Sequence, residues 1–168
     1  DLIVIDTAHG HSEKVLKILS KIRKSNDNTP ICVGNIATGE AAKKLYNSGA
    51  NIIKVGIGPG SICTTRMVAG IGVPQITAIM EVSKVLRGKK IKIISDGGIK
   101  FSGDIAKAIA AGADAIMMGS IFAGTDESPG KKFKIKNKFY KQYRGMGSIG
   151  AMSAGSSNRY FQKNYKDK

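Results

Sequence analysis

Short apolar runs alternate with amphipathic stretches along most of the chain. Five runs are rich in Ile, Val and Ala and end near a glycine or a polar residue, which predicts buried strands. They are Leu2–Ile5, Ile31–Val33, Ile52–Val55, Ile91–Ile94 and Ala115–Met118. Between them, apolar residues recur at helical spacing, as at Val15, Leu19 and Ile22. The pattern predicts repeated β/α units around a parallel sheet, and therefore an α/β fold.

Capping residues mark where the predicted helices begin and end. Ser12, Thr38 and Ser102 are expected N-caps, and Pro74 precedes a helix that runs to Leu86. Glycines tolerate the left-handed conformation that commonly follows a helix. The glycines expected to end helices here are Gly49, Gly88 and Gly112.

Polar residues follow the five predicted strands, at the edge where parallel α/β folds hold their active sites. They are Asp6, Asn35, Cys63, Asp96 and Ser120. Residues 96–98 and 119–120 are glycine-rich, and residues 121–124 are long enough for a short helix that could bind phosphate. Such a phosphate site often follows the final two strands of a TIM barrel. We therefore expect three further strands before residue 1; the alternative is an open, doubly wound sheet.

Residues 56–66, with the sequence GIGPGSICTTR, combine a glycine-rich turn with a thiol. Glycine lets a ligand approach the backbone closely. Cys63 stands among hydroxyl side chains, and the positive charge of Arg66 would favour its thiolate, which is the nucleophilic form. A cysteine is more often a buried core residue, but this setting favours a nucleophile. With only Cys32 besides, the chain lacks the disulfide framework of small secreted proteins, which predicts a cytoplasmic setting.

The same stretch resembles the catalytic cysteine loop of the IMP (inosine-5'-monophosphate) dehydrogenase family, which GMP reductase shares. The resemblance extends over nearly the whole chain. Its further motifs are ISDGGI at 94–99, SGDIAKA at 102–108, AGTDESPG at 123–130, YRGMGSIGAM at 143–152 and RYF at 159–161. The turn at 102–104, residues 125–130 and the Arg159-Tyr160 pair favour the dehydrogenase over GMP reductase.

This resemblance implies a (β/α)8 TIM barrel, of which residues 1–130 would supply about the last five β/α units. Residues 131–168 would form a basic, flexible active-site flap. We expect Lys131–Lys141 to be loosely organised, and the Ser/Ala/Gly/Asn-rich residues between Met152 and Arg159 to be disordered without ligand. The implied reaction is IMP + NAD⁺ + water → XMP + NADH. The family also implies a potassium ion and a cytoplasmic homotetramer.

The resemblance assigns roles residue by residue. Cys63 would add to C2 of the purine. After hydride transfer, Arg159 and Thr65 would activate the water that hydrolyses the thioimidate, and Tyr160 completes the arginine-tyrosine pair. The substrate would be bound by Ser61, Asp96, Gly98, Gly119, Ser120, Tyr143, Gly145, Met146 and Gly147. The cofactor residues would be Asp6, Asn35 and Gly56. The carbonyls of Gly58, Gly60 and Cys63 would ligate the monovalent cation.

Charge leaves a different class of function open. The net charge is +15, and residues 131–168 hold eleven of the 27 Lys and Arg residues against a single acidic residue. A basic tail can bind nucleic acid, but its aromatic residues follow no RNA-binding motif, so a solvated flap that neutralises an anionic ligand is favoured. No apolar run approaches the length of a membrane span. GMP reductase remains the nearest alternative, and a non-catalytic fragment is a third.

Overall fold

A five-stranded parallel sheet forms the centre of the computed structural model, which describes residues 1–25 and 28–161. Neighbouring strands follow chain order, and every pair is parallel. The strands are β1 (Ile3–Asp6), β2 (Ile31–Ile36), β3 (Ile52–Val55), β4 (Lys92–Asp96) and β5 (Ala115–Met117). The predicted α/β fold with parallel strands is therefore confirmed.

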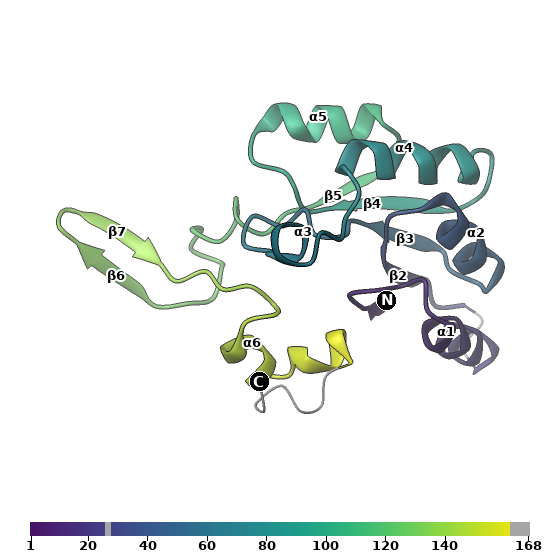
Figure 1. Cartoon of the computed structure of the whole chain (residues 1–168), viewed down its shortest axis with the longest axis horizontal. Coiled ribbons are helices and arrows are strands. Elements are labelled where there is room, and N and C mark those ends of the chain that lie inside the picture. The colour runs from purple at the N-terminus through teal and green to yellow at the C-terminus, as the bar shows by residue number, and fades with distance from the viewer. Residues whose placement is uncertain (26–27, 162–168) are drawn as a thin grey trace.

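Helices follow the first four strands, and all but the short third one bury residues in the core on the sheet (Figure 1). They are α1 (Glu13–Ser25), α2 (Gly39–Asn47), α3 (Thr65–Val68), α4 (Gln75–Leu86) and α5 (Ser102–Ala110). Two predicted caps are confirmed: Ser12 Oγ accepts from the backbone N–H of Val15, and Thr38 Oγ1 from that of Ala41. Gly49 and Gly112 follow their helices with φ of 101° and 113°, which only glycine adopts readily.

Strand register gives the two faces of the sheet different chemistry. One in-register row packs with the helices in the apolar core, and it contains Ile5, Val33, Ile53 and Ile93. The next residue along each strand points to the opposite face. There Asp6, Gly34 and Lys54 are in register across β1, β2 and β3. The face away from the helices is therefore charged near the carboxyl edge of the sheet.

Two local predictions are wrong. Helix α5 begins at Ser102 itself, because the carboxylate of Asp104 accepts from the backbone N–H groups of Lys100 and Phe101 at 3.1 and 3.0 Å and takes over the capping role of Ser102. Residues 121–124 form turns instead of a short helix. Their backbone bonds span three residues, from Phe122 N to Gly119 O and from Thr125 N to Phe122 O, and do not continue as a helix.

The C-terminal part is more regular than the sequence predicts. Instead of a loose segment, 131–141 contains an antiparallel hairpin, β6 (Lys132–Ile135) and β7 (Lys138–Lys141), with Phe133 and Tyr140 stacked at 6.1 Å between ring centroids. Instead of disorder, 149–160 contains α6 (Ile149–Ser153) and a 3-10 helix, η1 (Ser156–Tyr160). The rest of the predicted flap, 162–168, lies outside the described residues.

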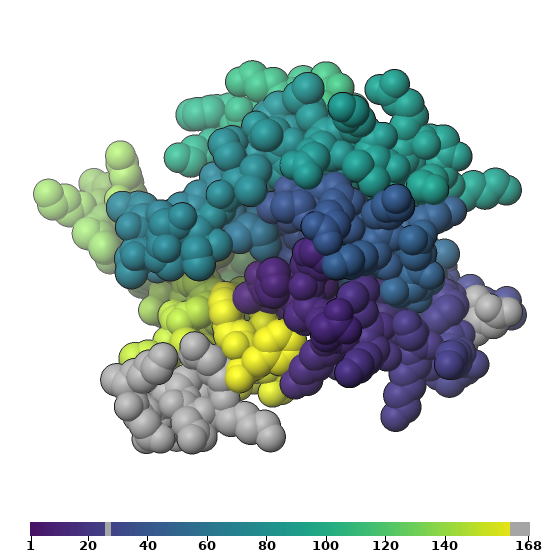
Figure 2. All heavy atoms as spheres, turned by 45° about the vertical axis from the view of Figure 1, so that its right-hand side comes forward, coloured from purple at the N-terminus to yellow at the C-terminus, as the bar shows by residue number. Residues whose placement is uncertain are grey.

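The hairpin and the α6–η1 segment take different courses from the sheet. The hairpin projects away from it, whereas α6 and η1 return to the side opposite α4 and α5, near the N-terminus (Figure 1). The space-filling view shows the same neighbourhood, with the yellow C-terminal residues beside the purple N-terminal ones (Figure 2). The backbone N–H of Ala8 donates to the carbonyl of Arg159 at 3.0 Å, which ties η1 to the loop after β1. No helix in the described part of the chain is long and apolar enough to cross a membrane.

Candidate active site

A charged cluster lies at the carboxyl edge of the sheet. Lys54 Nζ is 2.8 Å from Asp6 Oδ1 and 2.8 Å from Asp96 Oδ2, so one lysine of β3 joins the ends of β1 and β4. Asn35 Nδ2 donates to Asp96 Oδ2 and to the carbonyl of Gly56, each at 2.9 Å. The structure thus brings Asp6, Asn35, Gly56 and Asp96 together, although they come from four different strands and loops.

Lys54 is the member of this cluster that sequence reasoning missed. It lies in a predicted apolar strand, and only 3% of its surface is exposed. A lysine is almost never buried without a partner, because desolvation of the ammonium group is costly. The available signal was therefore the charge of Lys54 within the apolar run Ile52–Val55, although Lys92 in Ile91–Ile94 gives the same signal without being buried.

Arg159 of η1 joins the cluster from the other end of the chain. One of its guanidinium nitrogens, Nη1, forms an ion pair with Asp6 Oδ2. Burial alone would raise the pKa of Asp6, but its hydrogen bonds with Lys54 and Arg159 outweigh burial and hold that pKa below its ordinary value. Burial alone would lower the pKa of Arg159, but Asp6 outweighs it and raises that pKa. Both groups are therefore held in their charged forms.

Cys63 and Thr65 form the second part of the site, on the loop after β3. The Cys63 side chain is exposed, and its thiol donates to the Thr65 hydroxyl at 3.2 Å. Arg66 donates to the carbonyls of Ile57 and Val73, at 3.1 and 2.5 Å, and so closes the loop on itself. The favourable effect of Arg66 on the thiolate stays a prediction, since these contacts bind its guanidinium to the backbone.

Cys32, the other thiol, has the opposite surroundings. It lies in β2 and is 2% exposed. Neither Cys32 nor Cys63 forms a disulfide. Burial raises the pKa of Cys32, which the nearby charge of Lys54 only partly offsets. The Cys32 thiol is therefore sheltered and less readily ionised.

Glycines let the cysteine loop pack against the end of β4. A Cβ atom on Gly97 would lie 3.0 Å from Pro59 Cγ, and one on Gly98 would lie 3.3 Å from Pro59 Cβ. Gly56 has a φ of 152°, and a side chain there would collide with the carbonyl oxygen of Asp96. This packing brings the loop of Cys63 and the Asp96 cluster to the same edge of the sheet.

Only some of the other residues predicted to bind the substrate lie close to one another. A Cβ atom on Gly119 would collide with the hydroxyl of Tyr143, whereas Ser61 and Ser120 are exposed on turns. A pocket of about 1060 Å³ lies beside Gly119 and Tyr143, and Glu127, Lys131 and Arg144 also line it. Two basic residues against one acidic residue leave its lining with a single net positive charge.

The loop predicted to contact the purine bridges the cysteine loop and η1. A Cβ atom on Gly145 would lie 3.5 Å from Ile62 Cδ1, next to Cys63. A Cβ atom on Gly147 would lie 3.4 Å from the hydroxyl oxygen of Tyr160, and the Ser156 hydroxyl donates to the carbonyl of Met146. Residues 145–147 therefore sit between the candidate nucleophile and the Arg159-Tyr160 pair.

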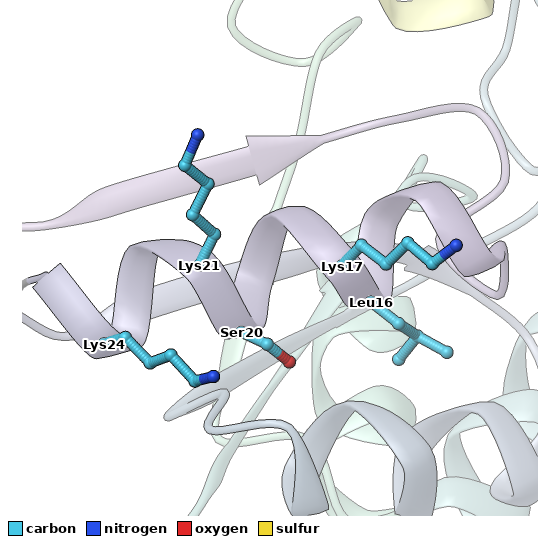
Figure 3. Close-up of a pocket in the computed structure, with 5 residues that line it drawn as sticks. All are labelled: Leu16, Lys17, Ser20, Lys21 and Lys24. Atoms are coloured by element: carbon cyan, nitrogen blue, oxygen red, sulfur yellow. The ribbon is translucent and has the colours of Figure 1, made fainter.

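A second hollow, of about 370 Å³, lies along α1 and away from this site (Figure 3). It is lined by Leu16, Lys17, Ser20, Lys21 and Lys24. The side chains of Lys17 and Lys24 extend the same way along the helix, Lys21 points to another side, and the three amino groups do not converge on one point (Figure 3). This hollow therefore lacks the arrangement that would fix a ligand.

The fold and site define an α/β domain that carries an exposed thiol and a charged cluster at the carboxyl edge of a parallel sheet. More particularly, the chain belongs to the IMP dehydrogenase / GMP reductase domain family, whose model matches residues 1–168. This confirms the family resemblance of the sequence motifs.

Three curated relatives match nearly the whole of this chain but only part of their own length. The chain is 56% identical over 167 residues to inosine-5'-monophosphate dehydrogenase of Rhizobium tropici, covering 99% of this chain and 34% of that protein. It is 59% identical over 162 residues to the protein of that name from Streptococcus pyogenes and 57% identical over 164 residues to that from Chlorobaculum tepidum, covering 96% of this chain and 33% of each protein. The chain thus spans about a third of the length of these relatives.

Proposed function

We propose that the protein carrying this chain oxidises IMP to XMP with NAD⁺, through a covalent bond between Cys63 and the purine. The observation that carries the proposal is the convergence of the Cys63 loop, the Asp96 cluster and Arg159 at one sheet edge. The relatives' printed name supports this activity. The overall reaction is IMP + NAD⁺ + H₂O → XMP + NADH + H⁺.

Cys63 would supply the nucleophile. Its sulfur attacks C2 of the purine as the thiolate, so the thiol must first lose its proton to solvent water. The Thr65 hydroxyl, 3.2 Å from the sulfur, would then turn to donate a hydrogen bond to the thiolate. Bound NAD⁺ would supply the hydride acceptor. Water would then attack C2 of the thioimidate, release XMP and return the electron pair of the C–S bond to Cys63. An exposed position on a loop suits a sulfur that must reach a bound base.

Asp96 would hold the ribose of IMP. Its bonds to Lys54 and Asn35 both use Oδ2, at 2.8 and 2.9 Å, which leaves the oxygen Oδ1 to accept from ribose hydroxyls. We propose Ser61, Gly98, Gly119, Ser120 and Tyr143 for the phosphate, and Gly145, Met146 and Gly147 for the base. The pocket beside Gly119 supports the phosphate assignment because Lys131 and Arg144 line it and outnumber its one acidic residue, Glu127.

Asp6 would hold the nicotinamide ribose, with Asn35 and Gly56 beside it. The carboxylate of Asp6 suits ribose hydroxyls, and its 36% exposed side chain is reachable. Arg159 occupies Asp6 Oδ2, so the arginine and the cofactor ribose would compete for that oxygen. Arg159 would therefore have to leave Asp6 when NAD⁺ binds.

The ion pair also limits how Arg159 could activate water. Asp6 raises the pKa of Arg159, which opposes the loss of a proton from the guanidinium group. Arg159 could act as a base only after it separates from Asp6; beside Asp6 it would orient the water as a cation. Tyr160 would complete this pair next to Gly147.

The carbonyls of Gly58, Gly60 and Cys63 would hold a monovalent cation, which we propose to be potassium. Backbone oxygens suit a hard cation, and the Gly60 carbonyl already turns toward Cys63, whose N–H it accepts at 3.0 Å. The described residues contain no group of three or more His, Cys, Asp or Glu side chains placed to hold a metal. A cation bound by the three carbonyls would order the loop that carries the thiol.

We further propose that the sheet is part of a (β/α)8 barrel, of which residues 1–130 supply five units, in a cytoplasmic homotetramer. The order β1 to β5 supports this, since β1 and β5 each have a free edge among the described strands. The charged face of the sheet would then line the barrel interior near its carboxyl end.

The deciding experiment uses the natural full-length protein. Purified protein with IMP and NAD⁺ should form NADH and XMP, Cys63→Ala should abolish both products, and Cys32→Ala should leave turnover intact as the matched control. Consumption of NADPH with GMP and release of ammonia would instead assign the GMP reductase alternative. Retention of NADH formation by Cys63→Ala would disprove the covalent mechanism.

A further inference from the structure

We propose that Lys54 is a positioning residue that serves both nucleotide subsites at once. It fixes Asp96, proposed for the ribose of IMP, and Asp6, proposed for the ribose of the dinucleotide. The names of the two ligands rest on the proposed function. The bridge itself rests on two 2.8 Å contacts from a single ammonium nitrogen.

The charge balance of the cluster depends on this lysine. The side chain of Lys54 is 4% exposed, and those of Asp6 and Asp96 are 36% and 22% exposed. Because both carboxylates contact the same nitrogen, their nearest oxygens cannot be far apart, and without the ammonium group they would repel each other. Arg159 would still pair with Asp6, and Asp96 would keep the hydrogen bond from Asn35. Removal of Lys54 should therefore displace both carboxylates from the orientations that the ammonium group holds.

The sheet is built to let Lys54 reach across a strand. Asp6 on β1, Gly34 on β2 and Lys54 on β3 are in register, so the glycine lies directly between the two charged residues. A Cβ atom on Gly34 would lie 2.6 Å from Lys54 Cβ and 2.7 Å from its carbonyl oxygen. The absent side chain at Gly34 leaves the space that the lysine uses to contact Asp6.

Lys54 also determines which carboxylate oxygens remain for ligands. It takes Oδ1 of Asp6 and Oδ2 of Asp96, and Asn35 shares the latter oxygen. Each carboxylate is thereby held in one orientation: Oδ2 of Asp6 pairs with Arg159, and Oδ1 of Asp96 is left for a ligand. A ribose would meet a fixed acceptor, which saves the entropic cost of ordering that acceptor on binding.

The test measures the binding of each nucleotide separately in the full-length protein. In a Cys63→Ala background, which cannot form the covalent bond, equilibrium titration gives the dissociation constants of IMP and NAD⁺. We expect Lys54→Met to weaken both by roughly tenfold or more, as loss of a charged hydrogen-bond partner does. Asp96→Asn should mainly weaken IMP, and Asp6→Asn should mainly weaken NAD⁺. Lys54→Arg should restore part of both affinities because it keeps the charge.

Lys92→Met is the matched control. Lys92 is also a strand lysine with a carboxylate 2.8 Å away, Asp114, but it is 69% exposed at the opposite end of the sheet. The Lys92→Met variant should leave the dissociation constants of IMP and NAD⁺ unchanged. Weakening of only one nucleotide by Lys54→Met, unchanged affinities, or an equal effect of Lys92→Met would each overturn the proposal.

A second measurement separates this inference from the proposed function. Urea unfolding of the Lys54→Met, Asp96→Asn and double variants tests the bridge without any ligand. We expect the effect of Asp96→Asn on the unfolding equilibrium constant to be at least roughly tenfold smaller once Lys54 is absent. If the effects of the two substitutions on the free energy of unfolding are strictly additive, the Lys54 bridge is disproved. If the wild type binds neither nucleotide while this coupling is present, the proposed function fails and the structural role of Lys54 stands.

Discussion

At the scale of single residues, the two thiols differ in access and in proton affinity. Cys63 is exposed beside the Thr65 hydroxyl, whereas Cys32 is 2% exposed in β2 and has a raised pKa because of burial. Thiolates are the reactive species, so burial slows alkylation both by blocking access and by disfavouring ionisation. The structure thus separates a candidate nucleophile from a core residue of the same type.

We predict that Cys63 alkylates faster than Cys32 and that IMP protects it. Iodoacetamide labelling of the full-length protein, followed by peptide mapping, measures both rates in one sample. Cys32 serves as the internal control, and its rate should not respond to IMP. Earlier labelling of Cys32, or labelling of Cys63 at the same rate with and without IMP, would contradict the assignment.

Arg159 provides a second residue-scale prediction, because hydride transfer and hydrolysis need different groups. Arg159→Ala should still form about one equivalent of NADH per site and then turn over roughly 10²–10⁴-fold more slowly, which is the usual effect of losing a positioned acid or base. Stopped-flow absorbance measures the burst, and mass spectrometry of quenched protein should find the nucleotide on Cys63.

Cys63→Ala is the contrasting variant, and it should show no burst. If Arg159→Ala loses the burst as completely, the arginine is needed for binding or for hydride transfer and has no separate hydrolytic role. Arg159→Lys keeps a cation for Asp6, so it distinguishes loss of the ion pair from loss of the guanidinium group.

At the scale of elements, the approach of β2 to β3 depends on Gly34. A methyl group there would press on the Cβ and carbonyl oxygen of Lys54, which belong to the backbone region of the neighbouring strand and cannot move aside easily. We predict that Gly34→Ala lowers the free energy of unfolding by about 1–3 kcal/mol, the usual cost of overpacking. Urea unfolding followed by circular dichroism gives the value.

Gly103→Ala is the matched control for this change. Gly103 lies in α5, and a Cβ atom there would have no neighbour within 4 Å. Alanine is the better helix former by up to about 1 kcal/mol, so this variant should be neutral or slightly more stable. Equal destabilisation by both substitutions would show that the contact of Gly34 with Lys54 is not the cause.

At the scale of the whole molecule, the sheet has two free edges among the described strands. β1 and β5 stand at its ends, and Leu2, Val4 and Met117 are exposed there at 46, 51 and 43%. Unpaired, apolar strand edges favour association between chains. These edges are what further strands of a barrel would cover under the proposed architecture.

We therefore predict that a polypeptide limited to residues 1–168 forms no NADH from IMP and NAD⁺ and self-associates. Steady-state absorbance and sedimentation velocity measure the two properties, with the natural full-length protein as the positive control. A monomeric, catalytically active polypeptide of residues 1–168 would rule out the partial-barrel architecture.

The hydrophobic pattern and the motifs of adjacent residues were sufficient to predict most of the sheet and part of the candidate site. Strand and helix positions follow from hydrophobic period, and the position of Asp6, Asn35 and Asp96 follows because parallel strands end at one edge. The motif around Cys63 was readable because glycine, hydroxyl and thiol residues are adjacent in sequence. Ser102 does not cap α5, because the Asp104 carboxylate accepts from the backbone N–H groups at the start of the helix. Residue type alone does not predict which of the two side chains takes this role.

The α/β order of elements, the family and the candidate nucleophile can be read from the sequence, since each depends on neighbours along the chain. That Lys54 joins Asp6 to Asp96 and that Arg159 pairs with Asp6 became visible only in the folded chain. These contacts link residues 42 or more positions apart, and they depend on strand register and on the empty space at Gly34. Register and close approach are properties of packed strands, so a charged residue in an apolar run acquires its partners only when the sheet forms.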